Sequence, residues 1–381
     1  MPRAPSGWCA VWAGLAAAAL LGGCASPAPV RIGFAGELTG LQSDLGIQGR
    51  DGALLAVDDL NAAGGLDGRP LELLIEDDRG TPEGAVAADR ALISANVVAI
   101  IGHMTSGQTL AGLAVTEPAG LVMLSPTAST TELSGQDDLF FRVISPAPDL
   151  AAALSRHAFQ AQGLRRLAII LDLDNAGYSR AFADGFTADL QAAGGQVIER
   201  LEISSAAKPD FAGLAQALRV AGPDAVLIVM SAADAAVLAQ QVRLAGWEVP
   251  LLAAPWAQTE TILRTGGQAV EGMVFSSPFD TTRQTPDYLD FRRRFTERFG
   301  REPGFAAAMA YESVHVLAAA LRTTQGSAEG LAAALKDIPP VSVLDSVIAL
   351  DANGDVVRPV ALVTIQSGAF APLGAVTLAP P

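Results

Sequence analysis

The chain has 381 residues, of which half are hydrophobic and 17% are charged, so it is long enough to form two domains around separate cores. Acidic residues outnumber basic ones by 40 to 25, which gives a formal net charge of −15 at pH 7. Because a surface this acidic repels phosphate backbones, we exclude nucleic acid as a partner.

The N-terminal residues are typical of a bacterial secretion signal. An apolar run from Val11 to Leu21 leads into Leu21-Gly22-Gly23-Cys24, which matches the lipobox of bacterial lipoproteins. The run is too short for a permanent membrane span, which needs roughly 20 apolar residues. We therefore expect residues 1–23 to be removed as a signal peptide, Cys24 to carry lipid, and residues 24–30 to form a lipidated tether.

The two cysteines support the same interpretation. Cys9 lies inside the signal and Cys24 is the lipid site, so the rest of the chain has no thiol for a disulfide, a zinc site or a nucleophile. A lipid anchor would place the protein in the periplasm or at the outer face of the cytoplasmic membrane. The alternative is an ordinary signal peptide cut near Ala25-Ser26, with Cys24 discarded.

After residue 30, short apolar strands alternate with amphipathic helices. In the first run we expect strands at Arg31–Ala35, Leu71–Glu76, Val97–Gly102 and Leu121–Ser125, and helices at Gly46–Ala63, Pro82–Ala95 and 106–117. Val97–Gly102 is continuously apolar and rich in β-branched residues, as expected for a strand that is covered on both faces. Strands separated by helices of this length predict parallel sheets with right-handed crossovers.

The same alternation forms a second run, so the two runs cover roughly 31–146 and 166–275. Its expected strands are Leu167–Leu171, Ala225–Met230 and Pro250–Ala254, and Ser145-Pro146-Ala147-Pro148 is the expected linker between the runs. The tail breaks the alternation. There we expect helices at Tyr288–Phe299, Phe305–Thr323 and Ser327–Lys336, and strands around Val347–Leu350 and Val360–Ile365.

A series of short motifs runs along the chain. The motifs are Arg31–Gly36 with Leu38-Thr39-Gly40, Gly52-Ala53, Asp59–Gly65, Glu76-Asp77-Asp78, Ile101-Gly102-His103, Ser125–Ser129, Ala310–Val314 and Asp351–Asp355. Taken together, they resemble the leucine/isoleucine/valine-binding protein family of periplasmic binding proteins. Each motif is weak alone, but their order and spacing follow the family from about residue 31 to about residue 370. The resemblance therefore covers almost the whole mature chain.

This resemblance implies an α/β fold of the type I periplasmic-binding-protein class, with parallel sheets flanked by helices in two lobes joined by three crossover segments. It implies that the first lobe comprises 31–146 plus 276–345, and that the second comprises 147–275 plus 346–381. A small-molecule ligand would bind between lobes that close over it, and an ABC permease in the membrane would recognise the closed form. We expect a monomer without a cofactor.

The residues themselves suggest a site on two loops, His103–Gly107 and Pro126–Glu132. Both follow strands at the carboxyl edge of a parallel sheet, where hydroxyls and helix N-terminal N–H groups suit a small carboxylate. On this reasoning alone, Ser106 and Ser129 could equally be helix caps. The resemblance implies that they hold the ligand carboxylate, and it places four further ligand-binding residues beside them: Met104, Thr105, Thr127 and Ala128.

The other half of the expected site departs from the family pattern. Trp256 stands where relatives that bind amino acids carry an acid for the ligand ammonium, and Ala176 and Ser231 stand where aromatic residues are common. We expect these three residues to contact the ligand, although Trp256 could instead be a core or hinge aromatic. Leu45, Ala306 and Ala232 also replace aromatic residues, and Gly80 and Thr105 replace the two halves of a disulfide that relatives often carry.

An ammonium buried without a partner costs several kcal/mol. Either the ligand lacks an ammonium, or another group serves it. Trp256 could do so by a cation–π contact of about 0.5–2 kcal/mol. The other possible partners are four acids of the second half of the chain: Asp172, Asp174, Asp234 and Asp280.

Catalysis has little support in the sequence. The three histidines, His103, His157 and His315, form no metal-binding spacing, and there is no G-x-S-x-G nucleophile motif. We expect no catalytic residue, no metal and no enzymatic activity, and we expect His103 to be a satisfied side chain at a strand end.

The sequence therefore predicts an extracytoplasmic solute-binding lipoprotein of an ABC importer. Its ligand would be a small carboxylate-bearing metabolite, such as an amino acid with a branched chain or a related acid or amide. Two alternatives stay open. The same fold could serve a ligand-sensing receptor, or it could be a structural envelope lipoprotein that regulates an enzyme.

Overall fold

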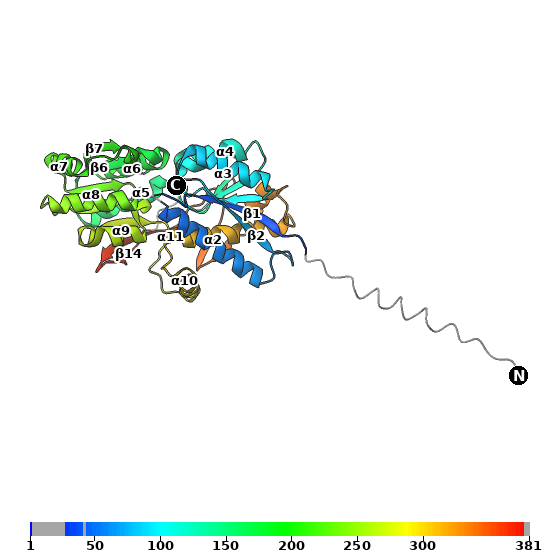
Figure 1. The fold of residues 1–381 in the computed structure, drawn as a ribbon. Helices are drawn as coiled ribbons and strands as arrows, with labels where there is room; N and C mark the ends of the chain where they lie inside the picture. Colours follow the sequence, from blue (N-terminus) through cyan, green and yellow to red (C-terminus); the bar gives the residue numbers. More distant parts are fainter. Residues whose placement is uncertain (2–26, 41–42, 377–381) are drawn as a thin grey trace.

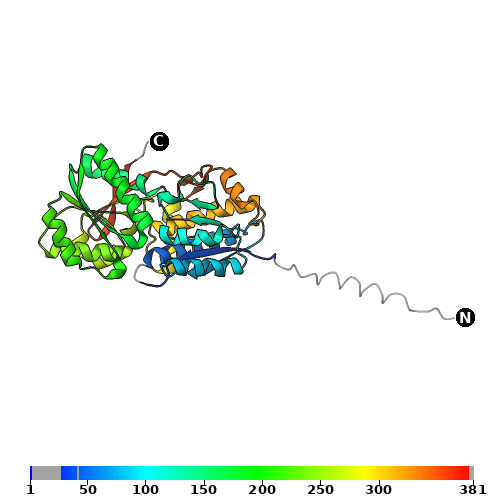
Figure 2. The same cartoon turned by 90° about the horizontal axis from the view of Figure 1, so that it is seen from above.

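The computed structural model describes Met1 and residues 27–40 and 43–376. The expected signal peptide after Met1, Cys24 and the first part of the tether lie outside these residues. The described chain forms two lobes side by side, each built on one central sheet with helices on both faces (Figure 1, Figure 2). Among the described helices, none has the length and apolar character needed to cross a bilayer.

The first lobe is built on a five-stranded, fully parallel sheet in the order β2-β1-β3-β4-β5. Its strands are β1 (Val30–Gly36), β2 (Leu71–Asp77), β3 (Ala99–Ile101), β4 (Val122–Ser125) and β5 (Phe140–Arg142). One face is covered by α3 (Pro82–Ser94) and α4 (Ser106–Thr116), and the other by α2 (Asp44–Ala62) and α11 (Phe305–Thr323) (Figure 1). Helix α11 is apolar almost all round and mostly buried, because it packs against both α2 and the sheet.

Three further elements of the tail, α10 (Pro286–Phe299), α12 (Leu331–Asp337) and the hairpin of β11 (Val341–Val343) and β12 (Ser346–Ile348), lie near α2 and α11. A helix was expected to begin at Ser327, but α12 begins four residues later. Gly330 stands at its N-cap with φ 77°, a left-handed conformation that cannot continue as a helix, and this explains the difference.

The second lobe is built on a seven-stranded sheet in the order β14-β13-β10-β9-β8-β6-β7. Its strands are β6 (Arg166–Asp172), β7 (Gln196–Ile203), β8 (Ala225–Val229), β9 (Leu251–Ala253), β10 (Val274–Ser277), β13 (Val360–Gln366) and β14 (Ala369–Val376). Strands β6 to β10 are parallel, whereas β13 and β14 run antiparallel to their neighbours.

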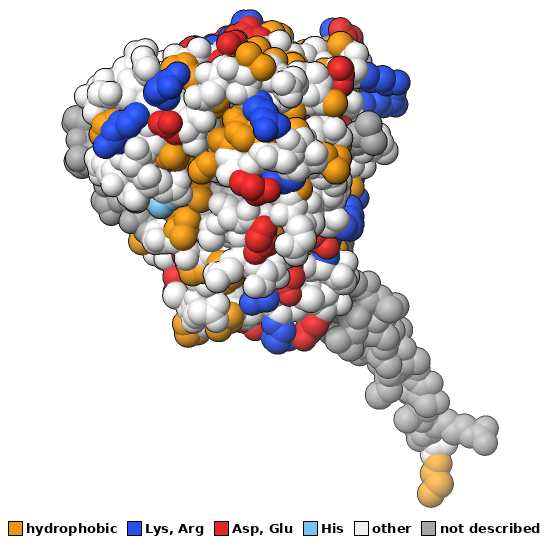
Figure 3. Space-filling view, turned by 90° about the vertical axis from the view of Figure 1, so that its left-hand side faces the viewer, with side chains coloured by type: hydrophobic (Ala, Val, Ile, Leu, Met, Phe, Trp, Pro, Cys, Tyr) orange, Lys and Arg blue, Asp and Glu red, His pale blue; other side chains and the backbone are white. Residues whose placement is uncertain are grey.

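Side chains of β6 alternate between the two faces of this sheet, as the two-residue period of a strand requires. Leu167, Ile169 and Leu171 pack with α5 (Ala147–Arg156) and α6 (Ala176–Ala192), whereas Ala168 and Ile170 pack with helices of the opposite face. The helices of that face are α7 (Phe211–Ala221), α8 (Ala232–Leu244) and α9 (Glu260–Gly266). At the end of this lobe that is drawn in Figure 3, acidic and basic side chains are mixed rather than gathered by sign.

The chain crosses between the lobes three times, after β5, after β10 and before β13. Two of these crossings are tied together by Arg358, which is 7% exposed. Its guanidinium donates to both carboxylate oxygens of Glu312 on α11, at 2.6 and 3.0 Å, and to the carbonyl of Val143. Its backbone N–H donates to Ser145 Oγ. The linker observed after β5 is shorter than the expected Ser145–Pro148, because Ala147 and Pro148 already form the first turn of α5.

The predicted strands and helices are present, but strands β5, β7, β10, β11 and β14 were not predicted from the sequence. Strand β7 lies at an edge of the sheet and mixes charged with apolar residues, so it lacks the strongly apolar run of a central strand. Strand β3 is shorter than the run Val97–Gly102, since only Ala99–Ile101 makes ladder contacts.

Candidate functional site

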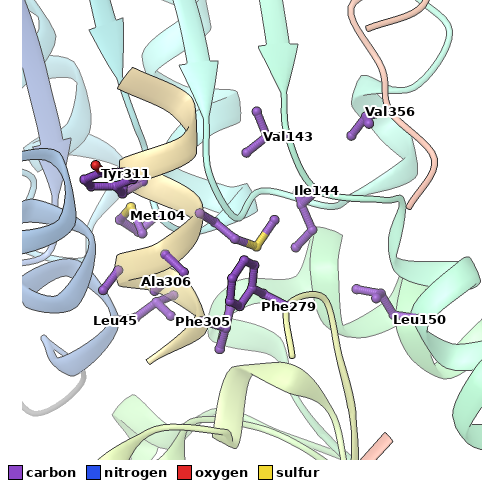
Figure 4. Packing of buried hydrophobic residues seen from close by; sticks show 14 of the residues in the cluster. Leu45, Met104, Val143, Ile144, Leu150, Phe279, Phe305, Ala306, Tyr311 and Val356 are labelled. Carbon is purple, nitrogen blue, oxygen red and sulfur yellow. The ribbon is translucent and has the colours of Figure 1, made fainter. Parts of the chain in front are cut away.

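A cavity lies between the lobes at the carboxyl ends of both parallel sheets. It comprises about 340 Å³ of space not filled by atoms, part of which is open to solvent, and only about 20 Å³ can hold the centre of a water molecule. Its walls are Leu45, Met104, Thr105, Ser106, Thr127, Ser129 and Phe305 of the first lobe, Ile144 of a crossover, and Leu150, Asn175, Tyr178, Pro255 and Trp256 of the second. Figure 4 shows Leu45, Phe305 and Ile144 where the ribbons of the two lobes meet. The cavity is thus assembled from both lobes.

The loops after β3 and β4 are linked to each other by hydrogen bonds. Ser125 Oγ donates to the carbonyl of His103 at 2.7 Å and accepts from the backbone N–H groups of Thr127 and Ala128. Thr127 Oγ1 donates to the carbonyl of Met104 at 2.6 Å. These bonds hold the two loops in one fixed arrangement at the cavity wall.

Neither Ser106 nor Ser129 caps a helix, so the alternative role considered for them is not what the structure contains. Thr105 is the N-cap of α4, and Ser106 Oγ instead accepts from the backbone N–H of Thr130 at 3.2 Å. Ser129 is fully buried, and its hydroxyl makes no hydrogen bond within the described chain. Because buried hydroxyls nearly always have a partner, the Ser129 hydroxyl is available to a ligand in the cavity.

His103 is a satisfied strand-end side chain, as the sequence analysis expected. Its ring is fully buried, with Nδ1 2.7 Å from a carboxylate oxygen of Asp78 and Nε2 3.1 Å from one of Asp89. Burial alone would favour the neutral ring, but the hydrogen bonds to Asp78 and Asp89 outweigh it and raise the pKa of His103 to about 9. The ring therefore carries a proton at neutral pH and anchors the backbone on which Met104 begins the cavity wall.

On the side of the second lobe, the first turn of α6 and the loop after β9 reach the cavity. Asn175 Oδ1 accepts from the backbone N–H of Gly107 at 3.2 Å, a hydrogen bond that crosses between the lobes. The rings of Tyr178 and Trp256 meet edge to face, with centroids 6.1 Å apart. Burial raises the pKa of the Tyr178 hydroxyl, against the smaller opposing effect of the Trp256 backbone amide.

The structure brings six of the nine predicted ligand-binding residues to the cavity: Met104, Thr105, Ser106, Thr127, Ser129 and Trp256. Ala128 lies behind the wall, where it is buried among apolar side chains. Ala176 begins α6 and is not in the wall, and Ser231 is the N-cap of α8, where its hydroxyl accepts from the backbone N–H of Asp234. Ligand contact remains a prediction for the six residues in the wall. For Ala128, Ala176 and Ser231, this cavity gives no support to the prediction.

Two aromatic rings of the cavity wall come from residues close to the positions where the resemblance implied aromatic residues. The resemblance implied aromatic residues at the positions of Ala176 and Ala306, and the nearby Tyr178 and Phe305 line the cavity. Asn175 was also not predicted from the sequence. The only local signal for Asn175 and Tyr178 was their place just after the strand of residues 167–171, at the start of a helix.

The four acids considered as partners for an ammonium are engaged elsewhere. Asp172 accepts from Ser205 Oγ at 2.7 Å and its pKa is raised by burial. Asp174 accepts from Ser204, Asp234 from Ser231, and Asp280 from Thr282. None of the four is in the wall, and no described wall residue is an Asp, Glu, Lys, Arg or His.

A family model described as periplasmic binding protein matches residues 29–369, on both sides of the cavity. Leu/Ile/Val-binding protein homolog 3 of Brucella melitensis is 26% identical over 340 residues, which cover 88% of this chain and 90% of that protein. The structure of a leucine-binding protein from Thermotoga maritima superposes with a TM-score of 0.84 at 25% identity, over 91% of this chain and 98% of that one. An ABC transporter substrate-binding protein from Desulfitobacterium hafniense in complex with Leu superposes with a TM-score of 0.76 at 27% identity, over 91% and 100% of the two chains.

Proposed function

Because the chain belongs to the periplasmic binding protein family, we propose that it captures a small carboxylate-bearing metabolite between its lobes for delivery to an ABC permease. The relatives from Brucella melitensis and Thermotoga maritima are named for binding leucine or branched-chain amino acids, and the one from Desulfitobacterium hafniense was solved with Leu. These names support a branched-chain amino acid, or a related acid or amide, as the ligand class.

One observation carries this proposal: the cavity has hydroxyls at one end and an uncharged apolar wall around the rest. Ser129 supplies a buried hydroxyl without a partner, and Ser106 begins α4, whose N-terminus carries a partial positive charge that favours an anion. Apart from the Asn175 amide, which is bonded to Gly107, apolar and aromatic side chains form the rest of the wall. Burying an aliphatic group there is worth about 1.5–3 kcal/mol. A carboxylate with a short apolar tail suits both parts.

The narrowness of the cavity supports a role for lobe motion. Only about 20 Å³ is open to the centre of a water molecule, and hydrogen bonds from Gly107 to Asn175 and from Thr261 to Asp44 connect the lobes across the cleft. We propose that a ligand enters when the lobes move apart by bending at the crossovers. We propose that the described arrangement is the closed form that a permease would recognise.

We propose binding rather than catalysis as the activity. The histidine nearest the cavity, His103, is held on both ring nitrogens by Asp78 and Asp89 and cannot act as a base toward Ser106 or Ser129. A group of three or more His, Cys, Asp or Glu side chains suited to a metal is not found among the described residues.

The remaining features extend the proposal to the whole chain. We propose a monomer whose residues 1–23 are a signal peptide and whose Cys24 carries lipid, so that the tether anchors it in the periplasm or at the outer face of the cytoplasmic membrane. We propose the expected lobe division, 31–146 plus 276–345 and 147–275 plus 346–381, with two boundaries moved. The 275/276 boundary moves to the end of β10, which belongs to the second sheet, and the 345/346 boundary moves to the crossing before β13, because β12 pairs with β11 beside the first lobe. The lipobox supports the anchor, and the return of β13 and β14 to the second sheet supports the division.

A thermal-shift screen of the mature protein tests the proposed function. Amino acids, their amides, short-chain acids and aromatic acids are compared, since a ligand that binds only the folded cleft raises the melting temperature by mass action. We expect at least one small carboxylate to stabilise the protein, and small-angle scattering to show lobe closure with that ligand. A protein that responds to none of them and stays equally compact would contradict the proposal.

A further inference from the structure

A second, smaller compartment adjoins the cavity behind Leu45 and Trp256, which line both spaces. It is lined further by Asp44 of the first lobe and by Ser231, Thr259 and Thr261 of the second. About 10 Å³ of it is open to the centre of a water molecule, which is room for about one group of that size. The compartment is thus a small polar annex to an uncharged cavity.

Asp44 gives this compartment a negative charge. It is the first residue of α2, where the helix N-terminus stabilises a carboxylate. One carboxylate oxygen accepts from the backbone N–H of Thr261 at 3.3 Å, and the other makes no hydrogen bond within the described chain. Asp44 is half-buried, so its carboxylate lies next to the compartment without being sealed in it.

Thr259 is a second and independent indication of a ligand. Its side chain is 6% exposed, and its hydroxyl has no hydrogen-bond partner among the described atoms. A buried hydroxyl without a partner is unusual and favours the presence of a polar guest. Together, a carboxylate, a free hydroxyl oxygen and the indole ring of Trp256 are the groups that bind an ammonium.

We propose that this compartment takes the ammonium group of a zwitterionic ligand, with Asp44 as its charge partner, while the ligand carboxylate lies at Ser129 and Ser106. The inference rests on the proposed function and narrows its ligand class to metabolites that carry both charges. The four acids expected from the sequence are engaged elsewhere, and Asp44 supplies the missing negative charge from the opposite lobe.

The division of the compartment between lobes has a consequence for closure. Asp44 belongs to the first lobe, whereas Trp256 and Thr259 belong to the second, so the complete ammonium site exists only when the lobes meet. An open form presents the hydroxyls of Ser106 and Ser129 but no paired carboxylate. The ammonium therefore contributes its binding energy only on closure.

The test compares matched ligands that differ by the ammonium group. L-Leucine is paired with 4-methylpentanoate, and 5-aminopentanoate with pentanoate, and each is titrated calorimetrically into wild-type protein and into Asp44→Asn. Asparagine keeps an oxygen for the Thr261 N–H but removes the charge. We expect Asp44→Asn to weaken the ammonium-bearing ligand at least tenfold while the ligand without ammonium changes less than twofold.

Two further variants serve as controls. Ser129→Ala should weaken both members of a pair by the same factor, because it acts on the carboxylate that they share. Asp67→Asn removes the same charge from an exposed turn at the opposite end of the first sheet, and it should change neither affinity. Circular dichroism and melting temperature show whether each variant is folded.

Each other outcome is decisive. Equal weakening of both members by Asp44→Asn would mean that Asp44 acts on closure alone, and the inference fails while the proposed function stands. If wild-type protein binds the ligand without ammonium more tightly than its ammonium-bearing partner, the compartment holds a water molecule. In that case too, the inference fails while the proposed function stands. If wild-type protein binds no member of either pair but binds another carboxylate of the thermal-shift screen, the inference fails while the proposed function stands. If it binds none of the screened carboxylates, both fail.

Discussion

Raising the pH tests the buried cluster that supports the loops of the site. The imidazole of His103 lies between Asp78 and Asp89 with no exposure to solvent, and both ring nitrogens face carboxylate oxygens. A neutral ring could donate from only one nitrogen, so the second carboxylate would face a lone pair. Loss of the proton therefore breaks one of the two bonds and leaves a charge buried without its partner.

The size of the effect follows from the pKa of His103, which is raised from its ordinary 6.5 to about 9. At about 1.4 kcal/mol for each tenfold change in proton affinity, this difference stabilises the fold by about 3 kcal/mol. Because the folded state binds the proton more tightly, the contribution is fully present below pH 6.5 and is lost as the pH rises through about 9. Between pH 7 and pH 10 the loss amounts to about 2.5 kcal/mol.

Urea unfolding at pH 7, 8, 9 and 10 measures this loss, with His103→Gln as the matched variant. Glutamine keeps a hydrogen-bonding amide but does not titrate. Between pH 7 and pH 10, the free energy of unfolding should therefore fall by about 2.5 kcal/mol more in wild-type protein than in the variant. The nitrogen chemical shifts of the His103 ring give the pKa directly. If wild-type protein and His103→Gln lose stability in parallel, the ring is neutral in the folded state and the reasoning is wrong.

Three further predictions concern the cavity, the crossovers and the membrane. Ser129→Ala and Ser106→Ala should each weaken ligand binding by about 1.5–3 kcal/mol, the value of a hydrogen bond to a charged group, and unchanged dissociation constants in calorimetry would remove them from the site. Glu312→Gln should lower the free energy of unfolding in urea by about 3 kcal/mol, because Arg358 stays buried without its charge partner. The double variant Glu312→Met with Arg358→Met should recover much of this loss. If the single and the double variant lose the same stability, the prediction is wrong. Cys24→Ser should release the protein from membranes in cell fractionation, and retention in the membrane pellet would refute the lipid anchor.

Most of the fold was predictable because its signals are local. The strands near Leu167–Leu171 and Ala225–Met230 are apolar runs bounded by helices, and Phe305–Thr323 was predicted with the bounds that the structure has. Edge strand β7 was missed because Glu199, Arg200 and Glu202 interrupt its apolar residues, and an edge strand with only its last residue buried tolerates such charges. The start of α12 was misplaced because the left-handed turn at Gly330 carries no hydrophobic signal.

The half of the candidate site in the first lobe was also predictable, since Met104, Ser106 and Ser129 lie on loops that directly follow strands of one parallel sheet. The sequence by itself determined that these hydroxyls meet at one edge, because neighbouring parallel strands end together. The tertiary structure alone decided the rest. It placed Tyr178 and Asn175 against the first lobe and brought Asp44 beside Trp256, more than 200 residues away in the chain. Such contacts depend on the angle at which the crossovers set the lobes, and no local pattern of residues encodes that angle.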